Sequence, residues 1–465
     1  MENKERLQDR LINWMRYSIS LRMVVIGVLT LILLIPLTYI KDLINERQFR
    51  QESVVNEVNE KWGGQVIIYG PVLSLPYRFY TEVYKTDPES KETFMEREEN
   101  TSVIFVFPEE LSIDGVLSPH IKKRGIYNTV VYNGKTNIDG YFGMPDLESL
   151  DIKTEDIIWE KAKVIIQTSN LKGINNDIKI NMNKRVYSFL PIYSQRKNSL
   201  DHYEDVIVNM HSLESAALKL KGPDDLKKLR YSLNLDLNGS KQIRFIPVGR
   251  ITTVQMRSTW DSPSFIGSYL PYNEDKIQEE GFDAKWKVLN INRGFGQLYK
   301  SRIPDLSEYA FGVKLMLPVD QYQQSMRSAK YGYLVIALTF LVFFLIQTIS
   351  KIHIHPFQYL MIGIALTLFY ILLISISEHS NFFVSYMISG LSVLSLISLY
   401  SRSILKDKRF TAMIAASLLL LYAFIFVIIQ LENYALIVGS IGLFFILALV
   451  MYASRKIDWD MSGRK

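Results

Sequence analysis

Residues 357–376 read FQYLMIGIALTLFYILLISI and contain no Lys, Arg, Asp or Glu. A helix of about 20 apolar residues is long enough to cross the hydrocarbon core of a bilayer, which is roughly 30 Å thick. Five further stretches meet the same test, at 23–40, 331–349, 382–400, 411–430 and 434–452. Buried helices of soluble proteins seldom lack all charge, and five of the six stretches follow one another at the C-terminal end. The sequence therefore predicts six transmembrane helices.

The charged residues divide the chain into two kinds of region. The 465 residues carry a formal net charge of +6, but residues 41–330 contain 39 basic and 39 acidic side chains and are neutral. The basic excess therefore flanks the apolar stretches, which disfavours nucleic-acid binding. The chain has no Cys, which excludes disulfides, thiol catalysis and Cys-liganded metal sites.

The first apolar stretch has two interpretations, a cleaved signal peptide or a retained anchor. It follows a basic segment, as both would. Its apolar run covers 23–40, and Lys41-Asp42-Leu43 follows it without a small-residue cleavage site. We therefore predict an uncleaved signal-anchor.

The flanking cations predict one orientation for all six spans, because cytoplasmic loops are enriched in Lys and Arg. One side carries Lys351, a basic loop at 402–409 and a basic tail, whereas the loops on the other side carry Glu378 and Glu432 but no Lys or Arg. We expect a cytoplasmic N-terminus at 1–22, the anchor at 23–40, an extracytoplasmic domain at 41–330, a five-helix bundle at 331–453 and a cytoplasmic tail at 454–465.

The extracytoplasmic region is predicted to consist mainly of strands. A segment at 43–61 without Gly or Pro reads as a helix that leaves the membrane and ends at Gly63-Gly64, and 319–330 reads as a second helical connection. Between them, apolar and polar residues alternate in many short runs, and Asn133-Gly134 is a hairpin signal between two of these runs. The predicted class is an α+β membrane protein whose large, mainly antiparallel β domain is sandwich-like with roughly 12–16 strands, with two β subdomains as an alternative.

Ionisable residues near the ends of the spans are the candidates for chemistry. Glu378 and His379 follow one span, and Glu432 lies at a comparable depth after another. These three form either an outer polar cluster or ordinary interfacial loops, and the sequence favours the second interpretation. His353 and His355 supply only two metal ligands, too few for a closed site. The sequence therefore predicts no catalytic residue, no metal and no cofactor.

Small residues recur within the fourth span at helical spacing. They are the serines at positions 385, 389, 392 and 395. Such a face either lines a pore or allows helices to pack closely, and packing is favoured because the spans contain no charged residue at mid-depth.

The segment STWDSPSFIGSYLP, residues 258–271, is the candidate contact loop of the outer domain. It concentrates large or rigid side chains in the order Trp260, Pro263, Phe265, Tyr269. Clustered aromatic residues are common in protein interfaces. The alternative, which the sequence supports equally, is that these side chains close one end of the β domain.

Several stretches together resemble the CreD family of bacterial inner-membrane proteins. They include LLIPLTYIKDLINERQFRQESVVNEV at 33–58, WGGQVIIYGPVLSLPY at 62–77, RGIYNTVVYNGKTNIDGYF at 124–142, GFDAKWKVLNINR at 281–293, HPFQYLMIGIALTLFYILLISISEHSNF at 355–382 and RKIDW at 455–459. The resemblance implies an inner-membrane location, a periplasmic outer domain and a role in cell-envelope integrity or the envelope stress response. It carries no catalytic residues. Gln347 stands where we expect family members often to have an acidic residue.

Three functional hypotheses follow. The favoured one is a non-enzymatic envelope-maintenance protein that contacts the lipid bilayer and binds envelope proteins, peptidoglycan or lipids through its outer domain. The second is a transporter or lipid-handling channel that uses the C-terminal helices. The third is an intramembrane hydrolase that uses Glu378 and His379.

Overall fold

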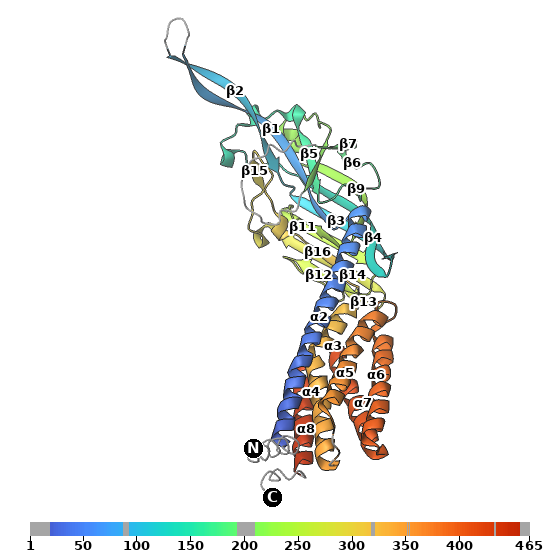
Figure 1. Ribbon diagram of the computed structural model, residues 1–465. Helices are drawn as coiled ribbons and strands as arrows, with labels where there is room; N and C mark the ends of the chain where they lie inside the picture. The colour runs from blue at the N-terminus through green and yellow to red at the C-terminus, as the bar shows by residue number, and fades with distance from the viewer. Residues whose placement is uncertain are drawn as a thin grey trace, which may run out of the picture. The chain divides into compact units, whose positions relative to one another are not determined.

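The computed structural model describes residues 19–86, 93–192, 210–317, 321–350, 352, 354–431 and 434–455. The chain divides into two compact units, Met1–Glu52 with Val319–Lys465 and Ser53–Pro318. The α-helices of the described part, labelled in Figure 1, are α2 (Ile19–Trp62), α3 (Gln321–Lys330), α4 (Gly332–Ser350), α5 (Pro356–Ser377), α6 (Phe382–Leu405), α7 (Lys408–Gln430) and α8 (Ala435–Ser454). All of these except the short α3 are long and apolar enough to cross a membrane, which confirms the six predicted spans.

Helix α2 packs in the first unit through one buried stripe at helical spacing. Its members are Leu33, Leu37, Ile40 and Ile44. A Cβ placed on Gly363 of α5 would lie 2.1 Å from Leu33 Cδ1, and one on Gly332 of α4 would lie 2.8 Å from Leu37 Cδ2. The two glycines therefore leave the space that the leucines fill, as small residues do between membrane helices.

The ends of the spans carry local signals that fix their boundaries. The side chain of Asn381 accepts a hydrogen bond from the amide of Val384 at the start of α6, and Asp407 caps α7 in the same way through Arg409. His355 Nδ1 accepts from the amide of Phe357 ahead of α5, over 3.2 Å. Caps of this kind satisfy amides that a helix leaves unpaired in its first turn.

The second unit contains sixteen strands in its described part. They are β1 (Val66–Thr86), β2 (Thr93–Val106), β3 (Glu110–Arg124), β4 (Tyr127–Phe142), β5 (Lys163–Thr168), β6 (Lys179–Met182), β7 (Arg185–Pro191), β8 (His211–Ser215), β9 (Leu229–Ser240), β10 (Gln242–Phe245), β11 (Ile251–Ser258), β12 (Pro263–Gly267), β13 (Ile277–Gln278), β14 (Gly281–Leu289), β15 (Leu298–Lys300) and β16 (Phe311–Leu315). The predicted α+β class with a mainly antiparallel β domain is confirmed, and among the described strands β1–β10 and β3–β11 are the parallel pairs.

The strands form one hydrogen-bonded path around one core. Its order is β12-β16-β10-β1-β5-β8-β7-β6-β9-β4-β3-β11-β14-β13, with β2 joining β1 to β15. Side chains from opposite ends of this path meet, because Phe265 of β12 lies against Phe282 and Trp286 of β14. The sheet therefore curls on itself, and its inner faces share a single apolar cluster. The alternative of two β subdomains is not what the chain forms.

Asn133-Gly134 does not form the predicted hairpin turn. Both residues lie inside β4, where they pair with Ser118 and Leu117 of β3 and with β9 on the other side. The turn from β3 into β4 instead contains Gly125, with φ of 61°. Pairing on both edges of β4 stabilises an extended Asn-Gly more than the local turn preference opposes it.

Helix α2 ends directly before Gly63-Gly64, as the sequence predicts, and its last turn is bonded to the β domain. The helix ends at Trp62, and the amides of Gly63 and Gly64 both donate to the carbonyl of Asn59. Gly63 has φ of 131° and Gly64 of 66°, a region that favours glycine. The hydroxyl of Thr129 on β4 donates to Asn59 Oδ1 over 2.9 Å, so the last turn of the helix is bonded to the sheet.

Candidate functional site

The aromatic residues of the candidate contact loop face inward. Trp260 Nε1 donates to the carbonyl of Met316 over 2.9 Å. The ring of Phe265 lies 6.1 Å from that of Phe282 and 5.8 Å from that of Trp286. Pro263 begins β12, where it pairs with Leu315.

Tyr269 is held in the same way. Its hydroxyl donates to the carbonyl of Asn292 over 3.1 Å, and its carbonyl accepts from Trp286 Nε1 over 3.2 Å. Its ring lies 5.6 Å from Phe311. These contacts favour the interpretation in which the loop closes one end of the curled sheet, and a role in partner binding stays a prediction.

Glu378 lies at the centre of a junction between three helices of the first unit. It follows α5, and its Oε1 lies 3.4 Å from Nη1 of Arg47 on α2. The hydroxyl of Tyr322 on α3 donates to the same oxygen over 3.4 Å. The Glu378 side chain is 14% exposed and that of Arg47 is 38% exposed. We call Arg47, Tyr322 and Glu378 the Glu378 junction.

The junction joins the two helices through which the chain enters and leaves the β domain. Helix α2 leads into the segment Ser53–Pro318, and α3 comes directly after that segment in the chain. Helix α3 is also fixed at a second point, because Arg327 Nη1 donates to the carbonyl of Ile429 in the last turn of α7 over 3.2 Å. A cation at that position also matches the partial negative charge of a helix C-terminus.

The other members of the predicted outer cluster do not join Glu378. His379 is exposed, and its amide donates a hydrogen bond to the carbonyl of Ile376. The hydroxyl of the nearby Ser377 donates to the carbonyl of Ile374. Glu432 lies outside the described residues, as does His353 of the predicted pair of histidines. The described part therefore shows no Ser, His and Glu arranged for hydrolysis.

The small-residue face of α6 does not line one continuous path. Ser385 and Ser389 are fully buried, and Ser385 Oγ lies 2.7 Å from Ser380 Oγ. Ser392 and Ser395 are exposed on the outside of the helix. This division fits close packing in one half of α6 and does not fit a pore that runs its length.

Gln347 forms a buried neutral pair with a tyrosine. The hydroxyl of Tyr359 on α5 donates to Gln347 Oε1 over 2.8 Å, and both side chains are buried. A hydrogen bond of this kind satisfies two polar groups that would be costly if left unpaired in a bilayer. Among the described residues, no group of three or more His, Asp or Glu side chains could hold a metal ion.

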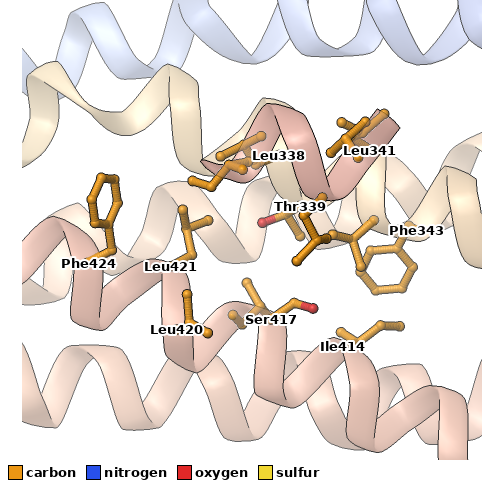
Figure 2. Close-up of a pocket in the computed structure, with 14 residues that line it drawn as sticks. Leu338, Thr339, Leu341, Phe343, Ile414, Ser417, Leu420, Leu421 and Phe424 are labelled. Atoms are coloured by element: carbon orange, nitrogen blue, oxygen red, sulfur yellow. The ribbon is translucent and has the colours of Figure 1, made fainter. Parts of the chain in front are cut away.

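An apolar cavity of about 150 Å³ lies between α4, α7 and α8. It is lined by residues within 338–343, 414–424 and 446–450, and Thr339 and Ser417 supply the hydroxyl groups of this lining. Figure 2 shows the labelled side chains of α4 and of α7 on opposite sides of the space.

Strands β1 and β2 continue past the rest of the β domain as a two-stranded ribbon (Figure 1). Residues 79–86 pair with 93–100, and in the described part these segments pair with no other strand. The ribbon exposes Tyr80, Tyr84 and Met95, and Tyr84 and Met95 lie directly opposite each other. Two-stranded ribbons bury little surface of their own, so exposed apolar side chains on one are a candidate contact surface.

The sequence does not indicate that Arg47, Tyr322 and Arg327 take part in contacts between helices, because their partners are far away in the chain. The sequence of α3 did contain one signal, the helical spacing of its small or aromatic residues at 322, 325, 328 and 329. All four are buried in the structure. This spacing places one face of a polar helix against the bundle.

Two comparisons with known proteins agree with each other. The family described as "Inner membrane protein CreD" matches residues 18–460 of the chain. A curated relative, inner membrane protein CreD of Escherichia coli (strain K12), is 28% identical over 432 residues, which cover 92% of this chain and 91% of the relative.

Proposed function

We propose that this chain, which belongs to the CreD family and is a multi-pass inner-membrane protein, maintains cell-envelope integrity or acts in the envelope stress response without being an enzyme. Its N- and C-termini lie in the cytoplasm, and residues 41–330 lie in the periplasm. The six apolar helices form the membrane base, and the β domain contacts envelope proteins, peptidoglycan or lipids.

The Glu378 junction is the observation that carries this proposal. Arg47 and Tyr322 come from the two helices that adjoin the β domain in sequence, and both bind one carboxylate of the bundle. A bundle that holds two such helices at one carboxylate can serve as a membrane base for the domain that lies between them in the chain.

The ribbon is the part of the β domain that we propose as the contact surface. Its exposed Tyr80, Tyr84 and Met95 are large side chains that the rest of the domain does not cover. The candidate loop at 258–271 is a weaker choice, since Trp260, Phe265 and Tyr269 are engaged in contacts inside the domain.

Complementation of a strain that lacks the gene tests the proposal. Phe79 and Asn100 are paired, so replacing residues 80–99 with Asn-Gly closes the ribbon early without disturbing the strands that enter the core. We expect the wild-type chain to restore resistance to detergent and exclusion of a fluorescent hydrophobic dye, and the shortened chain to fail at equal abundance. Tyr272→Ala, which removes an exposed tyrosine outside the ribbon, is the matched control. Full protection by the shortened chain would exclude the ribbon, and a knockout with an intact envelope would exclude the proposed role.

The proposed orientation has its own test, because the chain contains no Cys. Lys219→Cys places an exposed thiol in the β domain, and Lys406→Cys places one in the loop between α6 and α7. In cells with a permeabilised outer membrane, a membrane-impermeant maleimide should label the first variant only. Labelling of Lys406→Cys alone would reverse the orientation.

A further inference from the structure

We propose that the cavity between α4, α7 and α8 binds one acyl chain of a membrane lipid, whose headgroup stays at the membrane surface. This site is separate from the Glu378 junction and from the ribbon, so it does not depend on the proposed envelope role.

The lining of the cavity matches hydrocarbon. Ser417 and Thr339 are its polar side chains, and the hydroxyl of Ser417 is already bonded to the carbonyl of Met413 over 2.8 Å. A water molecule needs two to four polar partners to be stable in such a space, and the side chains of this lining offer at most two, the hydroxyl of Thr339 and the already bonded hydroxyl of Ser417. A cavity of about 150 Å³ takes up a benzene-sized group, so it accommodates a stretch of roughly six methylene or methyl groups.

The depth of the cavity points to the same occupant. The lining residues of α4 begin six positions after Gly332, so they lie roughly 9–17 Å along a helix of 19 residues, whose length is close to the thickness of a hydrocarbon core. The stretches 331–349, 411–430 and 434–452 contain no Lys, Arg, Asp or Glu. The surrounding medium at this depth is lipid hydrocarbon.

The cavity is accessible from the side of α8. That helix contains no buried residue, and Leu449, which lines the cavity, is 68% exposed, as is Leu420 of α7 at 69%. Helix α8 meets α7 closely near Gly442, where a Cβ would lie 2.1 Å from Phe424 Cζ. An acyl chain can therefore enter between helices, whereas a helix of a second copy, about 10 Å wide, does not fit.

Thr339 distinguishes a hydrocarbon ligand from a polar one. The residue is 3% exposed, and its hydroxyl has no hydrogen-bond partner among the described residues. The hydroxyl of Thr348 on the same helix, by contrast, donates to the carbonyl of Phe344. A polar ligand would use this hydroxyl. An acyl chain gains nothing from it, and removing it makes the lining more apolar.

The test uses the full chain in phosphatidylethanolamine and phosphatidylglycerol vesicles that contain a small fraction of a phospholipid with a diazirine in the middle of one acyl chain. After illumination, labelled peptides are quantified by mass spectrometry. We expect peptides of 338–343 and 446–450 to carry roughly three times the label of the exposed residues of α6, a modest excess because bulk lipid competes for the same surfaces.

Matched variants identify the site. Ser417→Phe fills the cavity and should remove the excess label from α4 and α8. Ser392→Phe is the control, since Ser392 is exposed on α6 and its hydroxyl also bonds to the preceding turn. Thr339→Val should leave the excess intact. If Ser417→Phe does not accumulate, the smaller Ser417→Leu replaces it.

Three labelling results would overturn the proposal, and a fourth result, from crosslinking, would do the same. The first is equal labelling of the cavity and of α6, and the second is an excess that persists in Ser417→Phe. The third is an excess that disappears in Thr339→Val, which would assign the space to a polar ligand. Crosslinks from these peptides to a second copy of the chain, in place of lipid adducts, would also contradict it.

Discussion

Arg47 and Glu378 are 331 positions apart in sequence and form an ion pair of 3.4 Å that joins α2 to the end of α5. Tyr322 binds the same carboxylate oxygen. Its two partners belong to different helices, Arg47 to α2 and Tyr322 to α3. The largely covered Glu378 carboxylate therefore connects the first span, α2, to α3, the short helix that precedes the other five spans.

Glu378→Gln should lower the stability of the first unit. The amide keeps the shape of the side chain but loses the charge that Arg47 faces, and we expect a cost of roughly 1–2 kcal/mol for this partly buried pair. A double-mutant cycle with Arg47→Gln, followed by thermal unfolding in detergent, should give a coupling energy of at least about 0.5 kcal/mol.

Glu57 provides the matched control for that cycle. It also has cationic partners, Lys61 at 2.7 Å and Arg124 at 2.9 Å, but all three side chains are about half exposed or more. Exposed ion pairs contribute little to stability, so Glu57→Gln should have the smaller effect. An equal effect of the two substitutions would show that the ion pair of Glu378 contributes no more to stability than an exposed ion pair does.

Gly63→Ala should strongly destabilise the β domain. Gly63 has φ of 131°, and a Cβ there would lie 2.3 Å from the carbonyl oxygen of Asn238. The backbone has to move, and we expect a loss of more than roughly 2 kcal/mol. Gly222→Ala should be nearly neutral, since no atom lies within 4 Å of the new Cβ and its φ of 171° is extended backbone. The measurement is the midpoint of chemical unfolding followed by Trp fluorescence, and similar midpoints for the two variants would contradict the prediction.

Gly363→Val should separate α2 from the bundle. The space that Gly363 leaves is filled by Leu33, and the larger side chain forces that leucine out of its buried position. We expect a loss of roughly 1–3 kcal/mol from overpacking. Gly390→Val on α6 is the control, because the nearest atom to its Cβ is Phe369 Cε2 at 3.9 Å. Thermal unfolding in detergent measures both, and a Gly390 variant that is the less stable of the two would refute the assignment of α2.

The β domain should lose stability in alkaline solution. Burial raises the pKa of Tyr69, Tyr132 and Tyr231 above the ordinary value of 10.0. A raised pKa means that the stabilisation is fully present below pH 10 and is lost as the pH rises above it, because the unfolded chain then releases protons that the folded chain retains. Burial also lowers the pKa of Arg293 to about 10 and lowers that of Arg244, and both shifts act in the opposite direction below pH 12.5, but they are two groups against three.

Tyr132→Phe tests this pH dependence on the most isolated of the three tyrosines. The hydroxyl of Tyr132 donates to the carbonyl of Gln242 over 2.9 Å, so the variant should lose roughly 1 kcal/mol at neutral pH. Above pH 10 the stability of the variant should fall less steeply with pH than that of the wild type. The two slopes should differ by about 1.4 kcal/mol per pH unit, the contribution of one tyrosine. The exposed Tyr80→Phe should change neither quantity. Parallel wild-type and Tyr132→Phe profiles above pH 10 would contradict the prediction.

The sequence predicted those parts of the fold that depend on local composition. The six spans, the continuation of the first helix to Gly63-Gly64 and the helix at 321–330 all agree with the structure. The hairpin predicted at Asn133-Gly134 was wrong, because pairing of β4 with β3 on one edge and with β9 on the other opposed the local signal. The loop at 258–271 illustrates a further limit, because aromatic composition alone does not say whether Trp260 and Tyr269 face the core or a partner.

The membrane spans follow from sequence alone, because an apolar stretch of that length can satisfy its backbone amides in a bilayer only as a helix. The alternation of apolar and polar residues likewise determined that the other domain is made of strands. Only the tertiary structure decided that Arg47 and Tyr322 meet Glu378, that the ends of one strand path close on each other, and that three helices leave an apolar space beside Thr339. Arg47 and Glu378 lie 331 positions apart. The energies of all these contacts depend on shape and on the partner of each polar group, which composition and spacing do not encode.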